Sequence, residues 1–106
     1  MNKICTNLEQ SKKLAKILPL ESADAHYWCN DGDDLRLGGG FSIDKDLDIP
    51  AWSLAALLDV YPMIVGRDMD MYCCWQNSKN LHSKHYDNPV DACYEMILKL
   101  HELKLL

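Results

Sequence analysis

Residues 88–106 carry the clearest hydrophobic pattern in the chain. Placed on a helix, their apolar side chains cover an arc wider than half the circumference, and the charged side chains share the remainder. Asn88 suits the N-cap and Pro89 the first helical position. Because one neighbour cannot cover so wide an arc, we predict a sheet beneath this helix and another helix, or a second copy of the chain, beside it. The apolar positions are Val90, Cys93, Tyr94, Met96, Ile97, Leu98, Leu100, Leu103 and Leu105.

Two shorter helices are predicted upstream. Residues 6–18 form the first, because Thr6 and Glu9 make a capping box and Pro19 disfavours helix at the residue before it. Residues 50–61 form the second, which Pro50 opens. It is mostly apolar, so we expect it to be well buried.

Four strands are predicted between the helices. Residues 25–30 and 35–37 are β-favouring segments on either side of a DGDD turn, which indicates a hairpin. Residues 69–75 alternate, so that Met69, Met71, Cys73 and Trp75 share one face, and 81–86 is the returning strand.

The predicted fold class is therefore α+β in the order α-ββ-α-ββ-α, within one domain spanning residues 1–106. We expect a small four-stranded, mainly antiparallel sheet packed with three helices. The two ββα units are faintly alike, since the positions of Tyr27 and Pro50 correspond to those of Tyr72 and Pro89. A duplication would relate them by a pseudo-twofold axis, and chance similarity is the alternative.

One resemblance comes from the second half of the chain. Trp52-Ser53-Leu54 with Leu57-Leu58 and Pro62, followed by an aromatic strand pair and by Asn88-Pro89-Val90-Asp91-Ala92, resembles small phage and prophage proteins with an α/β sandwich domain. The shared features are packing and capping signals. The resemblance implies a bacterial accessory protein of phage or mobile-element origin, and it supplies no catalytic or ligand residues.

Charge and cysteine content narrow the function classes. The net charge is −5, and residues 20–48 hold eight acidic residues against Arg36 and Lys45, so nucleic-acid binding is disfavoured. No apolar run approaches the ~20 residues of a membrane span, and no secretory signal is evident, so we expect a cytoplasmic protein. Five cysteines, an odd number, indicate reduced thiols in place of a disulfide framework.

The candidate metal and phosphate motifs are all incomplete. His26-x-x-Cys29 and His82-x-x-His85 lack the paired spacing of a zinc site. The run Asp44, Asp46, Asp48 begins like a calcium loop, but Ile49 and Ala55 stand where glycine and glutamate are required. The glycines 38–40 precede a strand-like segment, whereas a phosphate loop precedes a helix.

Catalytic signatures are also lacking. Cys93 and His101 would be the only cysteine–histidine pair on one helix, but two turns separate them, ~12 Å, far beyond hydrogen-bond reach. We therefore predict no catalytic residues, no cofactor and no metal.

The leading hypothesis is a non-catalytic interaction or accessory protein, either a homodimer or bound to an unidentified protein partner. One alternative is a small-ligand-binding or enzymatic domain with a pocket between sheet and helices, lined by Trp75, Tyr72, His82 and His85. Another is an acidic nucleic-acid mimic that uses residues 20–48. The candidate interface residues are Tyr94, Ile97, Leu98, His101, Leu105, Trp28 and Tyr86.

Overall fold

The structure, a computed structural model, describes residues 4–28, 35–37, 48–76 and 80–106. Within them it is a mixed α+β fold, as predicted, with three α-helices and six strands. None of the helices in these ranges is long and apolar enough to cross a membrane. The elements in chain order are α1 (Leu8–Leu14), the short 3-10 turn η1 (Leu20–Ser22), β1 (Ala25–Tyr27), β2 (Leu35–Leu37), β3 (Ile49–Ala51), α2 (Leu54–Val60), β4 (Ile64–Asp68), β5 (Met71–Gln76), β6 (Leu81–His82) and α3 (Pro89–Glu102).

The strands form two separate three-stranded antiparallel sheets, ordered β2-β1-β3 and β4-β5-β6, so the prediction of one four-stranded sheet is wrong. Each predicted hairpin has gained a strand. Pro50 pairs opposite His26 as part of β3, an edge strand where its missing N–H is tolerated. β4 occupies residues 64–68, where no strand is predicted from the sequence. The two units now both read βββα, but β1 is central in one sheet and β5 in the other, which differs from a simple twofold repeat.

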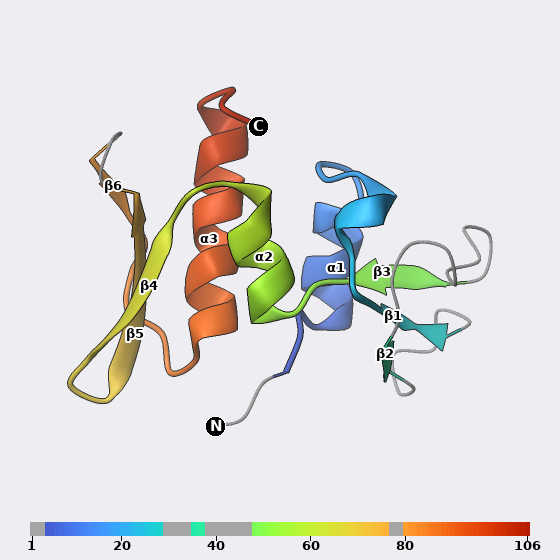
Figure 1. Ribbon diagram of the computed structural model, residues 1–106. Coiled ribbons are helices and arrows are strands. Elements are labelled where there is room, and N and C mark those ends of the chain that lie inside the picture. Colours follow the sequence, from blue (N-terminus) through green and yellow to red (C-terminus); the bar gives the residue numbers. More distant parts are fainter. Residues whose placement is uncertain (1–3, 29–34, 38–47, 77–79) are drawn as a thin grey trace.

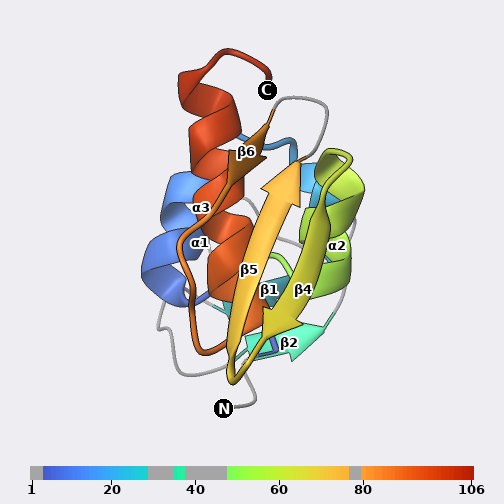
Figure 2. The same ribbon diagram turned by 90° about the vertical axis from the view of Figure 1, so that its left-hand side faces the viewer.

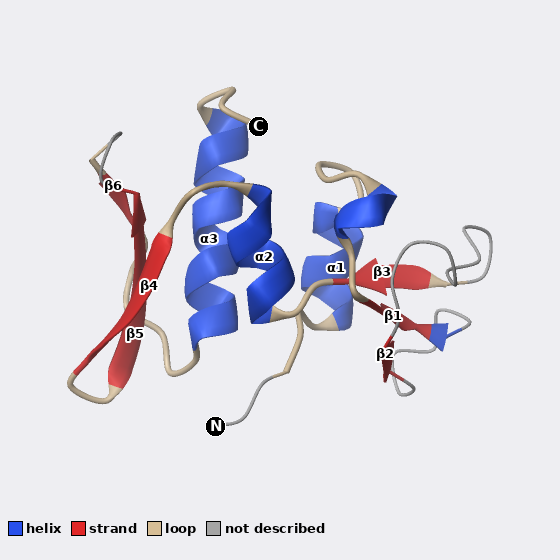
Figure 3. Ribbon diagram, in the orientation of Figure 1, coloured by secondary structure: helices blue, strands red, loops and turns tan. Residues whose placement is uncertain are grey.

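The helices form a layer between the two sheets (Figures 1 and 3). α3 packs on β5 and β4 with α2 beside it, and α1 packs on β3. Figure 2 looks onto the sheet β4-β5-β6, with α3 behind it. Only one face of that sheet is therefore covered by helices.

α3 confirms the main prediction from the sequence. The Asn88 side chain accepts a hydrogen bond from the Asp91 backbone N–H at 2.8 Å, and Pro89 opens the helix. The companion that the wide apolar arc requires is α2 of the same chain. The helix ends at Glu102, short of the predicted Leu106, and Leu103 is exposed beyond it. The buried residues of α3 are Val90, Ala92, Cys93, Met96, Ile97 and Leu100.

Both shorter helices begin later than predicted. Ser53, not Pro50, caps α2, because its side chain accepts from the Ala56 N–H and in turn bonds to the Asp24 carboxylate. Trp52 therefore lies before the helix, fully buried, with its indole N–H donating to the Ser22 hydroxyl at 2.9 Å. Asn7 caps α1 in place of Thr6, in a capping box with Gln10.

Thr6 instead ties α1 to the sheet β2-β1-β3. Its backbone N–H donates to the Trp52 carbonyl at 2.9 Å, its carbonyl accepts from the Tyr27 hydroxyl at 2.7 Å, and its own hydroxyl bonds to Ser11 at 2.7 Å. All of these groups are buried, so each bond spares a polar atom the penalty of desolvation without a partner. Cys5, Ala25, Tyr27 and Ala51 form a small core there, and the larger core lies around α3.

Candidate interaction surface

The face of the sheet β4-β5-β6 that points away from α3 is open (Figures 1 and 2). Along β5, Cys74 and Gln76 are buried toward the helices, so the alternate residues Met71, Cys73 and Trp75 lie on the open face. The register places Ile64 of β4 opposite Trp75. Ile64 is 49% exposed and Met71 is 38% exposed, which is unusual for large apolar strand residues.

A glycine makes this face flat. A Cβ atom on Gly66 would lie only 2.6 Å from Cη2 of Trp75, so the indole ring occupies the space that any side chain at position 66 would take. Gly66 pairs with Cys73, diagonally next to Trp75 across the strands. The ring thus lies along the sheet and covers backbone of the neighbouring strand. We call Ile64, Gly66, Met71, Cys73 and Trp75 the open face.

Polar groups lie at the edge of the open face. Nε2 of His85 lies 3.4 Å from the carboxylate of Asp68, which stands opposite Met71. His82 stands opposite Trp75 on β6 and is exposed. An apolar centre inside a polar rim is typical of protein–protein contact sites.

The candidate interface residues from the sequence do not gather into one patch. Ile97 is a correction: it is fully buried by the chain's own core and has no surface left for a partner. Tyr94, Leu98 and Leu105 are half-buried and His101 is exposed. Trp28 follows β1, in the sheet on the far side of the helical layer, where the Arg36 guanidinium lies 3.5 Å from its ring centre.

Tyr86 is held inside a polar network. Its hydroxyl donates to Oε1 of Glu95 at 2.6 Å, while the Lys84 N–H at 3.0 Å and the Lys99 ammonium at 3.3 Å contact Oε2. The bond to Glu95 raises the pKa of Tyr86 to about 12. Burial favours a higher pKa for Glu95, but the three donors outweigh it and the pKa is lowered. This network fixes the segment after β6 to α3.

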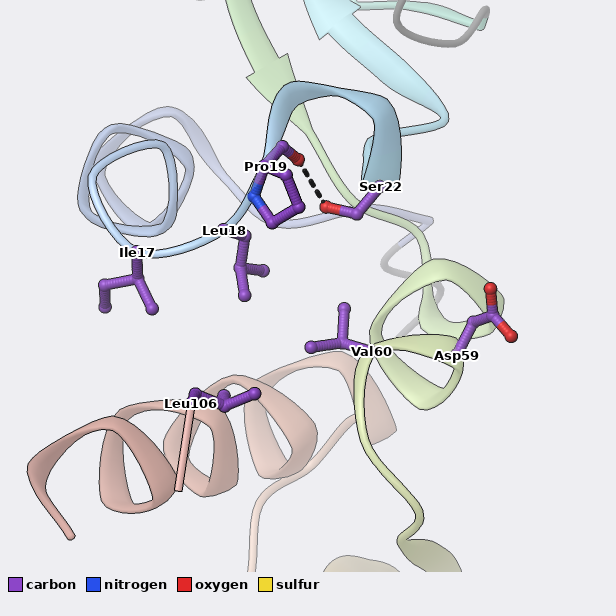
Figure 4. Close-up of a pocket in the computed structure, with 7 residues that line it drawn as sticks. All are labelled: Ile17, Leu18, Pro19, Ser22, Asp59, Val60 and Leu106. Carbon is purple, nitrogen blue, oxygen red and sulfur yellow. Dashed lines mark hydrogen bonds between the residues drawn. The ribbon is translucent and has the colours of Figure 1, made fainter. Parts of the chain in front are cut away.

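The proposed pocket residues do not line one space between the sheet and the helices. Trp75 and His82 are cross-strand neighbours that face outward, Tyr72 pairs with Tyr86 through the backbone, and His85 is exposed. A groove of about 360 Å³ lies elsewhere, where η1, the ends of α1 and α2, and the last residue of the chain meet (Figure 4). Its lining is mainly apolar. The Ser22 hydroxyl donates to the Pro19 carbonyl at 2.6 Å. Asp59 is the charged side chain among the residues that line the groove.

The remaining candidates are only partly described. Within the described ranges, no group of three or more His, Cys, Asp or Glu side chains is placed to hold a metal ion. His26 is buried with Nε2 3.9 Å from Asp48, and its Nδ1 has no hydrogen-bond partner in the part of the chain that is described. Cys93 is buried whereas His101 is exposed. Cys29, the DGDD turn, the glycines 38–40, and Asp44 and Asp46 lie outside the described residues.

The open face was missed in the sequence because alternation reveals two faces without saying which is inside. The exposed Ile64 belongs to β4, which was not predicted as a strand. Comparison of the chain with protein-family models, with curated proteins and with solved structures finds no match. The function is therefore inferred from the geometry of the chain.

Proposed function

We propose that this chain is a non-catalytic protein–protein interaction module that self-associates through the open face. The observation that carries the proposal is a sheet face that no helix covers, with the exposed apolar residues Ile64 and Met71 at its two ends and Trp75 beside Ile64. Removing apolar area from water contributes roughly 25 cal/mol per Å², so covering this face would stabilise the chain.

A second copy of the chain is the partner that best fits the shape. The outer edge of the Trp75 ring fills the space above Gly66, so the ring reaches across to the neighbouring strand. Two flat sheet faces stack about 10 Å apart, and a twofold axis brings two identical faces together. The edge of the face carries Asp68 and His85, so the His85 ring of one copy can meet the Asp68 carboxylate of the other.

A pair of charge substitutions tests this proposal. Ile64→Lys puts a charge on the open face beside Trp75, and Leu37→Lys makes the same kind of change on β2, where Leu37 is 79% exposed. Sedimentation velocity across a concentration series should show a dimer for the wild type and for Leu37→Lys, and a monomer for Ile64→Lys. A wild type that stays monomeric at high micromolar concentration contradicts the proposal, as does an Ile64→Lys variant that still dimerises.

We also propose a cytoplasmic protein of phage or mobile-element origin. The four described cysteines are free, as in a reducing compartment, and the resemblance of residues 52–62 and 88–92 to phage-type proteins supports the origin. Capture of partners from the native host and the identity of neighbouring genes test this. Recovery from a secreted fraction contradicts it.

The groove favours a second function, binding of a small apolar ligand. Its volume suits a small molecule, and Asp59 at its rim would attract a cationic end group. Val60→Trp should fill the space. A screen of apolar amines by thermal shift supports the idea if hits stabilise the wild type and lose their effect on Val60→Trp, and an absence of hits removes it.

A further inference from the structure

Three sulfur atoms meet in the larger core, between β5, α3 and the segment that joins α2 to β4. The Cys93 thiol donates to Sγ of Cys74 at 3.7 Å, and the Cys74 thiol donates to Sδ of Met63 at 3.7 Å. Both cysteines are fully buried and free, and Met63 is partly exposed. Cys74 therefore stands between a second thiol and a thioether.

This set of atoms matches the preferences of one kind of metal ion. Soft sulfur ligands select Cu(I), zinc and iron–sulfur clusters, and the clusters need about four Cys thiolates. An ion to one side of the line between Sγ of Cys74 and Sδ of Met63, which are 3.7 Å apart, can lie about 2.3 Å from both, the length of a metal–thiolate bond. Zinc suits the set less well, because structural zinc takes four ligands from Cys, His, Asp or Glu and here the third group is a thioether.

We propose that Met63, Cys74 and Cys93 form a binding site for a single Cu(I) ion. The Cys74 thiol loses its proton to solvent as the ion binds and coordinates as a thiolate, and the Met63 thioether is the second ligand. The Cys93 thiol keeps its proton and donates its hydrogen bond to the Cys74 sulfur. The complex of Cu(I) with one thiolate is neutral overall. A neutral complex suits this position, because burying a net charge is expensive.

The two cysteines are fully buried, whereas Met63 is partly exposed. An ion would therefore enter the site from the side of Met63.

The test uses the full, reduced wild-type chain under nitrogen, titrated with Cu(I) in the presence of the chelator bicinchoninate. We expect the protein to take one Cu(I) per chain from the chelator, to release about one proton per ion at neutral pH, and to show sulfur neighbours only in X-ray absorption. A wild type that takes no copper from the chelator overturns the proposal. So does nitrogen or oxygen coordination of the ion.

Variants locate the site. Met63→Leu nearly conserves volume, so it should fold, and it should lower Cu(I) affinity by about tenfold or more. Cys93→Ala should weaken binding, because it removes the hydrogen bond to the Cys74 sulfur. Cys5→Ala, a buried cysteine of the smaller core, and Cys73→Ser, a thiol of the open face, should both bind as the wild type does. Copper binding that survives Met63→Leu and Cys93→Ala unchanged, or that is lost in either control, overturns the proposal.

Discussion

The indole ring of Trp75 rests against the backbone of Gly66 on the neighbouring strand, so closely that a Cβ atom there would lie 2.6 Å from Cη2 and 3.1 Å from Cζ3. No side chain fits at position 66 unless the ring moves. We therefore expect Gly66→Ala to tilt the ring out of the sheet plane. The variant should lose about 1–2 kcal/mol in free energy of unfolding, measured by urea denaturation, and should self-associate more weakly.

A double-mutant cycle separates this contact from a general effect of alanine in β4. In a Trp75→Leu background the space over Gly66 is open, so Gly66→Ala should have little effect or be slightly stabilising. Additive effects of the two substitutions would contradict a direct clash between the ring and position 66.

The sequence of β5 does not determine which of the two faces of the strand is buried. Alternation along 69–75 correctly separates Cys74 from Trp75, but both residues are apolar and either face suits a core. Space decides between them: Cys74 is small and packs against Cys93 of the closely set helix α3, while bulky Trp75 is accommodated over a glycine on the open side. That choice depends on side-chain volumes on three elements, which no local pattern contains.

The turn between β4 and β5 holds an unfavourable residue. Met69 has a φ of 59°, a left-handed conformation that costs a non-glycine residue roughly 1–2 kcal/mol, and its side chain is 88% exposed. Met69→Gly should therefore raise the free energy of unfolding by about 0.5–1 kcal/mol, after allowing for the greater freedom of glycine in the unfolded chain. Met71→Gly, two residues later and inside the strand, should be destabilising. Equal signs for the two variants in urea denaturation would contradict this reading.

Helix α3 is the element that the sequence predicts best, and strand β3 is one that it does not predict. Asn88, Pro89 and a wide apolar arc are local signals that agree with one another, and α3 follows them. β3 is three residues long, contains Pro50, and forms because β1 offers it a free edge. Locally, Pro50 signals a helix start as well as it signals an edge strand, so only the tertiary pairing distinguishes them.

The cap of α3 should make a measurable contribution to stability. The buried Asn88 side chain accepts from the Asp91 N–H and donates to the carboxylates of Asp87 at 3.0 Å and Asp91 at 2.8 Å. Asn88→Ala removes all three bonds, so we expect a loss of about 1–2 kcal/mol in urea denaturation.

Asn88→Asp is the matched control, because aspartate also caps helices well. It keeps the bond from the Asp91 N–H but sets a third carboxylate beside Asp87 and Asp91. Added salt should therefore restore part of the stability of Asn88→Asp and have no such effect on Asn88→Ala. The same salt response in both variants would argue against the repulsion.

The hydrogen bond between Tyr86 and Glu95 should make the stability of the protein depend on pH in both the acidic and the alkaline range. The folded pKa of Glu95 lies below its ordinary value of 4.5, so its contribution to stability is present above that pH and is lost as pH falls through the folded pKa. The pKa of Tyr86 is raised from 10.0 to about 12, so its contribution is present below pH 10 and is lost between there and about 12.

Tyr86→Phe removes the hydroxyl that donates to Glu95. The Lys84 N–H and the Lys99 ammonium remain as donors to that carboxylate. The variant should be less stable by about 1–2 kcal/mol at pH 7. The difference in free energy of unfolding between the variant and the wild type should shrink below pH 4.5, where Glu95 becomes protonated in both proteins. It should shrink again above pH 10, because only the wild type has a Tyr86 hydroxyl that can lose its proton. Urea denaturation of both proteins from pH 3 to 11 measures this difference directly and cancels the titration of Cys5 and Tyr27, which are common to both. A deficit that stays constant with pH would mean that the phenol contributes by packing and that the bond to Glu95 adds little.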